Sequence, residues 1–558
     1  MSSRMKLLEE LSERRSRVRS LRHDESSGQL SCSHQRRVRT KVTVKPKSEI
    51  LVVPATKTDH PAWLPLSNLD RIVNPTFVSV IFFYENVLSD SKLGDGLKTF
   101  QGLTTSLKDS LAKVLVEFYP LAGRLTLTEE ELVDLQCNDA GAIFLESSIN
   151  FELSQLGGPQ PMPTLSGMDI MNNFASRGSG LLYIPDQVNT QIPVLVINVT
   201  KFACGSIAVA VNWHHTVADG FSGCHFIRSW AQIATGQELS LLPSHDRHLL
   251  KPRSPLDSSL VHNGNYGTLR KVEPIQQFPV QTRDPQAPLP YPVTVKSFIL
   301  TKNTVQRLKE KVNSNIEIGC SNSINTNTNH NNGTKRPFTS TETVSAELWK
   351  LITKARSSSS TAAAAAADSN EDLARRERSR FFMFVDGRKR LGLPKGYFGN
   401  VVCSACAESS RDDLLTRPLS YAASLISNAQ RAINDEYFRS LIDWVEETGL
   451  TPSTNSCQSE HLNSTGFDVA ATFWVFFPLY EINFGWGKPV LSVRNAPPRK
   501  LIDGIAMMPG PDGKGNMVAL LNLHADSMDK LQKDPEFIET AEPLHLENYG
   551  LGLKFLPV

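Results

Sequence analysis

Two adjacent histidines and a nearby aspartate are the residues whose types and spacing best suit chemistry. His214 and His215 directly follow an apolar run, and Asp219 and Gly220 come soon after them. A histidine titrates near pH ~6.5, so its neutral imidazole is available as a general base at pH 7. The end of a β-strand would hold such a side chain rigidly, as catalysis requires. The pattern therefore indicates general-base chemistry at His215.

A structural interpretation of the same residues stays open. Aspartate is a favoured N-terminal cap of helices, and Gly220 suits the turn before a helix. The two histidines could equally be hydrogen-bonded residues at the end of a strand. Taken alone, Asp219 is better explained by the structural role. What favours a catalytic role for His215 is the set of further motifs that the chain contains at other positions.

Hydrophobic periodicity predicts the elements that would position these residues. Apolar runs rich in β-branched and aromatic residues predict buried strands at 77–84, 193–200 and 206–213. Apolar residues at helical spacing predict helices over 97–118 and 221–236. Strands and helices alternate in both halves of the chain, which predicts an α/β or α+β architecture.

A long stretch rich in proline separates the two halves. Residues 241–293 contain nine prolines, and a structureless stretch of that length is more typical of a linker than of a loop. We therefore predict an N-terminal domain over 42–240 and a C-terminal domain over 294–558. The second domain would open with a strand at 295–300 and a helix at 303–312.

Three further segments have compositions that favour disorder. Residues 1–41 carry eleven Lys or Arg and five acids, so this extension has a net charge of +6 and the rest of the chain −4. Inserts near 317–335 and 356–370 are low-complexity runs of Asn, Ser and Thr, and of Ser and Ala. The basic charge is confined to the extension, so the body shows no pattern of nucleic-acid binding.

Cysteine usage and hydropathy argue against a disulfide-bonded, metal-binding, membrane-spanning or secreted protein. The eight cysteines are scattered, as expected for free thiols in a reducing compartment. Cys403 and Cys406 form a single C-x-x-C with no second pair, so no metal is expected. No run approaches the ~20 apolar residues of a membrane span, and the N-terminus lacks the apolar core of a signal peptide. A cytoplasmic protein without a transmembrane segment is expected.

Motifs along the chain resemble those of the BAHD acyltransferases, a plant and fungal family. The family signature H-x-x-x-D-G is matched by His215, Asp219 and Gly220. The second signature, D-F-G-W-G, corresponds to Asn483, Phe484, Gly485, Trp486 and Gly487, with one departure at the first position. Other family-like stretches follow in the family's order, at 66–70, 119–124, 385–388 and 396–400. The resemblance runs from about residue 42 to the C-terminus.

The resemblance implies a fold and an activity. The fold would consist of two similar mixed-sheet domains of the CoA-dependent acyltransferase superfold, that of chloramphenicol acetyltransferase. A long crossover loop would join them, with a channel between them. Acyl-CoA would be the co-substrate and no cofactor would be bound. A hydroxycinnamoyl or other aromatic or aliphatic acyl group would pass directly to an alcohol or amine in specialised metabolism. His215 would be the base, and the protein a monomer.

The resemblance also implies roles for single residues. The motif aspartate of the family pairs with an arginine of the second domain, which implies a structural pair between Asp219 and Arg388. Thr472 and Trp474 match a pocket motif of hydroxycinnamoyl-transferring relatives and are candidates for donating to the oxyanion. Asn483 keeps the shape and acceptor oxygen of aspartate without its charge. We expect a change in the rigidity of that loop, not an inactive enzyme.

Four apolar residues indicate the acceptor. Phe476 stands where relatives that use shikimate have a basic residue, so a carboxylate acceptor would lose its partner there. The strand at 77–84 faces the channel in those relatives. Because alternate residues share a face, Val78, Val80 and Phe82 would point inward. These apolar side chains favour a lipophilic acceptor.

Two other functions remain open at this point. Peptide-synthesising condensation domains share the pattern H-H-x-x-x-D-G, although this chain shows no carrier domain. A weakly active or inactive family member that acts as a binding or regulatory protein is the second alternative. The departure at Asn483 and the two inserts are what suggest it.

Overall fold

The computed structural model describes nine segments of the chain. They are residues 44–127, 133–150, 152–154, 191–259, 293–318, 336–357, 378–449, 467–495 and 504–544, apart from single positions at 58, 74, 75, 92, 512 and 514. The N-terminal extension, the linker from residue 260 and nearly all of both predicted inserts lie outside these segments. The described residues belong to the unit Val42–Val558, which is separate from Met1–Lys41.

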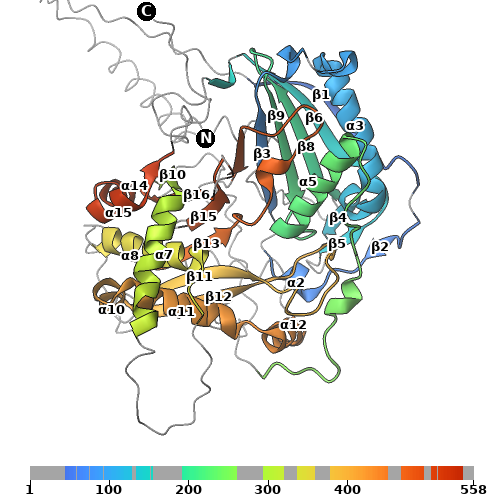
Figure 1. Cartoon of the computed structure of the whole chain (residues 1–558). Coiled ribbons are helices and arrows are strands. Elements are labelled where there is room, and N and C mark those ends of the chain that lie inside the picture. Colours follow the sequence, from blue (N-terminus) through green and yellow to red (C-terminus); the bar gives the residue numbers. More distant parts are fainter. Residues whose placement is uncertain are drawn as a thin grey trace, which may run out of the picture. The chain divides into compact units, whose positions relative to one another are not determined.

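A six-stranded mixed sheet contains the strand that leads to the two histidines (Figure 1). Its order is β1-β6-β8-β9-β3-β14; β6 and β8 are parallel and the other neighbours antiparallel. Its strands are β1 (Val44–Val52), β6 (Ala142–Ile149), β8 (Leu195–Lys201), β9 (Ile207–His214), β3 (Phe77–Tyr84) and β14 (Leu491–Asn495). The strands predicted at 77–84, 193–200 and 206–213 are thus confirmed as β3, β8 and β9.

Two more sheets complete the strand content of the described residues. The seven-stranded sheet has the order β12 (Val402–Ser410), β11 (Arg378–Asp386), β13 (Val469–Phe473), β15 (Gly504–Pro509), β16 (Met517–His524), β10 (Val293–Leu300) and β17 (Glu542–Pro543). A small sheet has the order β2 (Trp63–Leu64), β5 (Val133–Gln136), β4 (Arg124–Leu127) and β7 (Gln191–Pro193). Strand β10 confirms the prediction at 295–300.

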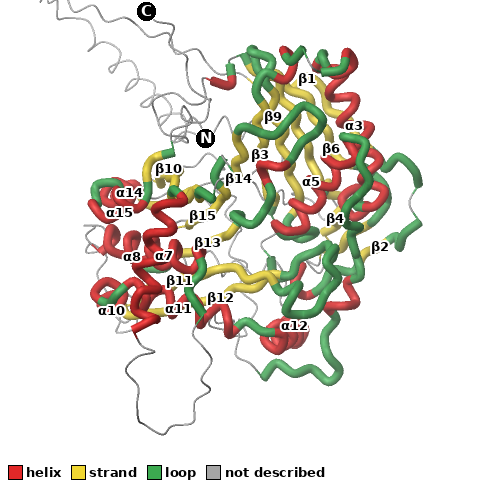
Figure 2. Tube along the Cα trace, viewed as in Figure 1, coloured by secondary structure: helices red, strands yellow, loops and turns green. Residues whose placement is uncertain are grey.

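Helices accompany both large sheets (Figure 2). They are α2 (Asn68–Arg71), α3 (Phe100–Glu117), α5 (Gly220–Ala234), α7 (Lys302–Ile318), α8 (Ser340–Ser357), α10 (Arg411–Thr416), α11 (Leu419–Ala432), α12 (Asp435–Thr448), α14 (Ala525–Leu531) and α15 (Pro535–Thr540). Short 3-10 helices are η1 (Val87–Ser89), η2 (Asp95–Leu97), η3 (Tyr119–Ala122), η5 (Arg247–Leu250) and η8 (Leu479–Glu481). Within the described segments, no helix is long and apolar enough to cross a membrane.

The helix boundaries follow from local capping. Helix α3 begins at Phe100, three residues later than the predicted 97, because the Thr99 hydroxyl caps it by accepting the N–H of Gly102 at 3.0 Å. Helix α5 confirms the prediction over 221–236, and α7 extends beyond the predicted 303–312. Part of the predicted linker is regular structure, since it contains η5.

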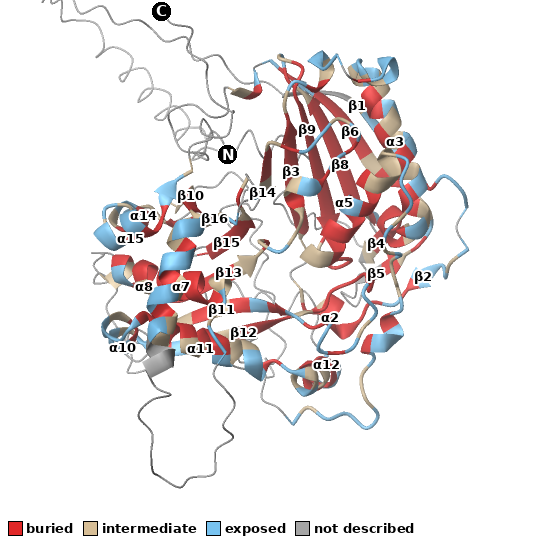
Figure 3. Ribbon diagram, in the orientation of Figure 1, coloured by how far each residue is buried: buried red, intermediate tan, exposed pale blue. Residues whose placement is uncertain are grey.

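Strand β3 lies between two apolar cores. Every one of its residues is buried, which explains a continuous apolar run instead of an alternating one (Figure 3). Val80 and Phe82 belong to the core that includes side chains of α3 and α5, whereas Ile81 and Phe83 belong to a separate core cluster. The alternation of the two sets follows from the two-residue period of a strand.

A strand from the C-terminal half completes the first sheet. β14 pairs with β3 in antiparallel register, with Arg494 opposite Val80 and Leu491 opposite Phe83. The two halves therefore share a sheet. Strand β14 places side chains of the C-terminal half beside β3, which in turn pairs with β9. The two mixed sheets with their helices confirm the predicted α/β (α+β) class, while the domain boundaries at 240 and 294 stay predictions.

Candidate active site

His215 is the first residue after strand β9. Its backbone N–H donates to the carbonyl of Thr76 at 2.7 Å, and the N–H of His214 donates to the carbonyl of Val194 at 2.9 Å. The N–H of Val217 then closes a turn onto the carbonyl of His214 at 3.0 Å. These bonds continue the ladder past the strand end, so the backbone of His215 is held between β3 and β8.

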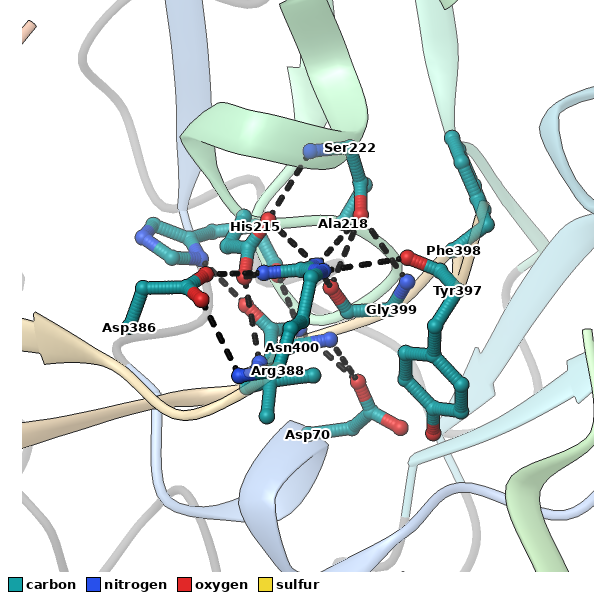
Figure 4. A network of polar contacts seen from close by, with 12 residues as sticks. Asp70, His215, Ala218, Ser222, Asp386, Arg388, Tyr397, Phe398, Gly399 and Asn400 are labelled. Atoms are coloured by element: carbon teal, nitrogen blue, oxygen red, sulfur yellow. Dashed lines mark hydrogen bonds and ion pairs between the residues drawn. The ribbon is translucent and has the colours of Figure 1, made fainter. Parts of the chain in front are cut away.

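The imidazole of His215 is oriented by Asn400 (Figure 4). Nδ1 of His215 lies 3.0 Å from Oδ1 of Asn400. The amide Nδ2 of Asn400 donates to the Asp70 carboxylate at 2.9 Å and to the carbonyl of His215 at 2.8 Å. Since both of those groups only accept, the network assigns the amide orientation and makes Nδ1 of His215 the protonated nitrogen. The lone pair is therefore on Nε2.

The environment of His215 favours its neutral form. Burial lowers the pKa of His215, and the nearby positive charge of Arg494 lowers it further. The charge of Asp219 and hydrogen bonds, including the one that His215 donates to Asn400, act in the opposite direction without reversing the net shift. At pH 7 the imidazole is thus unprotonated at Nε2 and able to accept a proton.

Asp219 caps helix α5 and pairs with Arg388. Its Oδ1 accepts the N–H of Ser222 at 2.9 Å, which is the N-cap bond. Both of its oxygens accept from the Arg388 guanidinium, at 2.8 and 3.0 Å. The structure thus contains the predicted pair, and both partners are buried. Burial alone would raise the pKa of Asp219, but the Arg388 guanidinium and the backbone donors hold it below its usual value.

The same arginine fastens the loop that carries Asn400. Arg388 donates to the carbonyls of Tyr397 and Gly399, at 3.1 and 2.8 Å. The Ser222 hydroxyl, at the start of α5, also accepts from Arg388 and donates to the carbonyl of Gly399. Arg388 therefore joins the turn after His215 to the residue that precedes Asn400 (Figure 4).

A second buried ion pair holds Asn400 from the other side. Nε of Arg247 lies 2.8 Å from Oδ2 of Asp70, and both side chains are almost fully buried. The other carboxylate oxygen accepts the backbone N–H of Asn400 at 2.8 Å. Arg247 also donates to the carbonyls of Phe398 and Val217. This pair completes the support of the His215 ring.

Sequence analysis assigns no role to Asp70, Asn400 or Arg247 of this network. Asp70 and Asn400 lie in the family-like stretches at 66–70 and 396–400, and membership of these stretches is the one signal that marks them. Arg247 lies in the proline-rich stretch, where nothing in the sequence marks it. Its role follows only from the fold, which brings η5 against α2 and the loop after β11.

Thr472 and Trp474 lie beside the turn that bears His215. The indole Nε1 of Trp474 donates to Oγ1 of Thr472 at 3.2 Å, and the ring is 4% exposed. A Cβ atom built on Gly220 would lie 3.4 Å from Cζ2 of Trp474, so the ring packs directly against this turn. Trp213, two residues before His215, is a further neighbour of the ring, at 6.4 Å between centroids.

The four residues used to predict the acceptor occupy different surroundings. Val78, Val80 and Phe82 are buried in the core cluster that also contains Trp474. Phe476 is 72% exposed, so its ring occupies no interior position. Phe476 therefore adds no support to the expectation of a lipophilic acceptor.

The loop at residues 483–487 keeps its shape with asparagine in place of aspartate. Oδ1 of Asn483 accepts the N–H groups of Gly485 and Gly487, each at 2.9 Å. Both glycines have positive φ, at 109° and 101°, a conformation that other residues rarely adopt. Phe484 is buried and packs on Trp230 of α5, with 4.7 Å between ring centroids. Trp486 packs on Tyr84 at the end of β3.

No cluster of three or more His, Cys, Asp or Glu that could bind a metal occurs among the described residues. Cys403 and Cys406 are free thiols on β12. Their strand pairs with β11, and burial raises the pKa of Cys406 to about 12, as is typical of a packed thiol.

Comparisons with known proteins assign the family. The model of the Transferase family matches residues 40–538, so the chain belongs to this family, the BAHD acyltransferases that its motifs resemble. Hydroxycinnamoyltransferase of Narcissus pseudonarcissus is 28% identical, over 84% of this chain and 93% of its own length. Shikimate O-hydroxycinnamoyltransferase of Nicotiana tabacum is 26% identical, over 88% and 98%. The family and these named relatives make the chain an acyltransferase.

The fold is also found in a solved structure. The crystal structure of vinorine synthase superposes with a TM-score of 0.60 over 90% of this chain and 100% of the other, at 20% sequence identity. This likeness confirms the predicted superfold.

Breaking the Asp219–Arg388 pair should destabilise the protein. The change Asp219→Asn leaves the buried guanidinium of Arg388 with the carboxylate of Asp386, 2.5 Å away, as its remaining counter-charge. The free energy of unfolding should therefore fall by about 3 kcal/mol. Denaturation by urea measures it. The control Arg378→Gln removes an exposed pair with Glu408 and should cost less than about 1 kcal/mol. Equal losses in the two variants would contradict a supporting role for Asp219.

Restoring the family aspartate should change little. The variant Asn483→Asp keeps the acceptor oxygen that both glycine N–H groups use, so the loop should keep its conformation. We expect an unchanged melting temperature and a turnover rate within about twofold of that of the wild type. A rise in turnover of tenfold or more would show that Asn483 limits activity.

Proposed function

We propose that the protein is an acyl-CoA-dependent O- or N-acyltransferase in which His215 is the general base. The observation that carries this proposal is the orientation of the imidazole, whose Nδ1–H donates to Asn400 and whose Nε2 keeps its lone pair. Such a base needs no covalent intermediate, because it can activate the acceptor itself. The named relatives transfer hydroxycinnamoyl groups, so a hydroxycinnamoyl-CoA is the first donor to test.

The proposed reaction proceeds through one tetrahedral intermediate. The acceptor hydroxyl or amine hydrogen-bonds to Nε2 of His215 and gives up its proton there as its oxygen or nitrogen attacks the thioester carbon. Collapse of the intermediate breaks the C–S bond, and the imidazolium returns the proton to the CoA thiolate. Positioned proton transfer of this kind contributes ~10²–10⁴-fold to the rate, and holding both substrates together adds more.

Thr472 is the better of the two candidates for the oxyanion donor. The N–H of Trp474 is already used, because it donates to the Thr472 oxygen. That bond leaves the Thr472 hydroxyl proton free to donate elsewhere, and the Thr472 side chain is partly exposed while Trp474 is buried. We propose that Trp474 orients Thr472, and that Thr472 donates to the developing oxyanion.

The interdomain channel remains part of the proposal. The base network joins groups from both predicted domains, since His215 and Asp70 precede residue 240 and Asn400 and Arg388 follow residue 294. A base supported from both sides in this way is suited to two substrates that arrive from different faces.

Removing the base should abolish turnover. We expect His215→Ala to release CoA at least about a hundredfold more slowly than the wild type, with an unchanged melting temperature. Release of CoA from p-coumaroyl-CoA in the presence of an acceptor mixture measures it. Activity near the wild-type level in this variant would reject the assigned base.

The pH dependence should show a lowered pKa. Because burial lowers the pKa of His215, kcat/KM should be constant around pH 7 and should fall only at pH values below the ordinary value of about 6.5. Stopped assays between pH 5 and 8 measure the profile. An acid limb above pH 7 would contradict the shift.

Loss of the orienting amide should reduce kcat more than it affects binding. In Asn400→Ala the imidazole can rotate and exchange tautomers, so kcat should fall by about a hundredfold while KM stays nearly constant. Asn400→Asp tests the same point in the opposite sense, because a carboxylate at Nδ1 should raise the pKa of His215 and move the acid limb to higher pH. An unchanged kcat in both variants would show that Asn400 has no positioning role.

A further inference from the structure

Arg494, on strand β14, is a partly buried cation that has no anionic partner among the described residues. Its guanidinium makes no hydrogen bond or ion pair with any of them, and its Nε is shielded from solvent without an acceptor. The side chain as a whole keeps some exposed surface. A guanidinium has five N–H donors and is costly to bury without a partner. The buried Nε–H of Arg494 is therefore a donor that an acceptor group of a ligand would satisfy.

The sheet register places Arg494 on the face of the active site. Arg494 lies directly opposite Val80, and residues opposite each other in an antiparallel pair point to the same face. Val80 and Trp474 belong to the same core cluster. The guanidinium carbon lies 5.4 Å from the centre of the Trp474 ring, which packs against Gly220 in the turn after His215.

The charge of Arg494 acts on the base itself. Burial lowers the pKa of Arg494 to about 10, so the guanidinium is still positive at pH 7. Its charge lowers the pKa of His215. The buried carboxylates of the network are already used, because Asp219 pairs with Arg388 and Asp70 pairs with Arg247. No described Asp or Glu forms an ion pair with Arg494, and burial is the cause of its lowered pKa.

We propose that Arg494 is a specificity residue that binds a carboxylate group of the substrate. The inference rests on the proposed acyl transfer and names the substrate class. A planar carboxylate matches the guanidinium in a bidentate arrangement, and the Trp474 ring holds that guanidinium by a cation–π contact. A carboxylate on the acceptor would differ from the lipophilic acceptor that Phe476, Val78, Val80 and Phe82 predicted, whereas a carboxylate on the acyl group would leave that prediction unchanged. Either the acceptor or the acyl group carries the carboxylate, and matched substrate pairs decide between them.

Substrate pairs that differ only in the carboxylate test the proposal. Shikimate and methyl shikimate serve as acceptors with p-coumaroyl-CoA; succinyl-CoA and butyryl-CoA serve as donors with a neutral alcohol. In Arg494→Gln the KM for the carboxylate member of one pair should rise at least tenfold, whereas the neutral member changes by less than twofold. The pair that responds identifies the acceptor or the donor as the carrier. Arg378→Gln, an exposed arginine, is the matched control and should leave both pairs unchanged.

A pH profile separates this role from a structural one. A bound carboxylate would neutralise Arg494 and raise the pKa of His215 in the complex. The acid limb of kcat, which reports the complex, should then lie at higher pH than that of kcat/KM, which reports the free enzyme. With the neutral member of the pair the two limbs should coincide. An equal loss of kcat for both members in Arg494→Gln would assign Arg494 to the oxyanion or to the fold and overturn the proposal.

A binding measurement keeps the proposal testable if no turnover is found. Benzoate and benzamide, titrated calorimetrically into wild type and Arg494→Gln, report carboxylate binding without acyl transfer. Selective binding of benzoate that is lost in the variant would support the proposal even if acyl transfer is absent, in which case only the proposed function fails. Equal binding of the two probes would overturn it. Arg494→Met should melt no lower than the wild type, and a variant that cannot fold would show that Arg494 is structural.

Discussion

The hydrogen bond between Nδ1 of His215 and Oδ1 of Asn400 is the contact on which the proposed chemistry of this protein depends. It decides which imidazole nitrogen carries the proton, and it joins a residue of the N-terminal half to one of the C-terminal half. Two buried ion pairs hold the two ends of this contact in place, Asp219 with Arg388 and Asp70 with Arg247. Neither ion pair needs to touch a substrate to be required for activity.

The sequence predicted the elements whose local pattern is strong. The apolar runs of β3, β8 and β9 and the capped helix α5 were recognisable because each is determined by its own residues. His215, Asp219 and Arg388 were singled out by their motifs, and the structure brings Asp219 and Arg388 into contact. Strand ends and helix caps are local features, and local features can be read from sequence.

The remaining features depend on contacts between distant segments. Arg247 reaches Asp70 across 177 positions, and nothing in the composition of its proline-rich stretch indicates this pairing. Strand β14 joins a sheet built from residues far earlier in the chain, so only the pairing with β3 shows that Arg494 faces the site. The prediction of a lipophilic acceptor used Phe476 and one face of the strand at 77–84, and it stays a prediction. No pattern in the sequence placed Arg494 opposite that strand.

The tautomer of His215 is the most direct test of the central claim. Nitrogen-15 spectroscopy of histidine-labelled protein at pH 7, with His215→Gln used to assign the signal, distinguishes a protonated ring nitrogen from an unprotonated one. The account predicts a proton on Nδ1 and a free lone pair on Nε2, and loss of that preference in Asn400→Ala. A proton on Nε2, or a doubly protonated ring at pH 7, would contradict it.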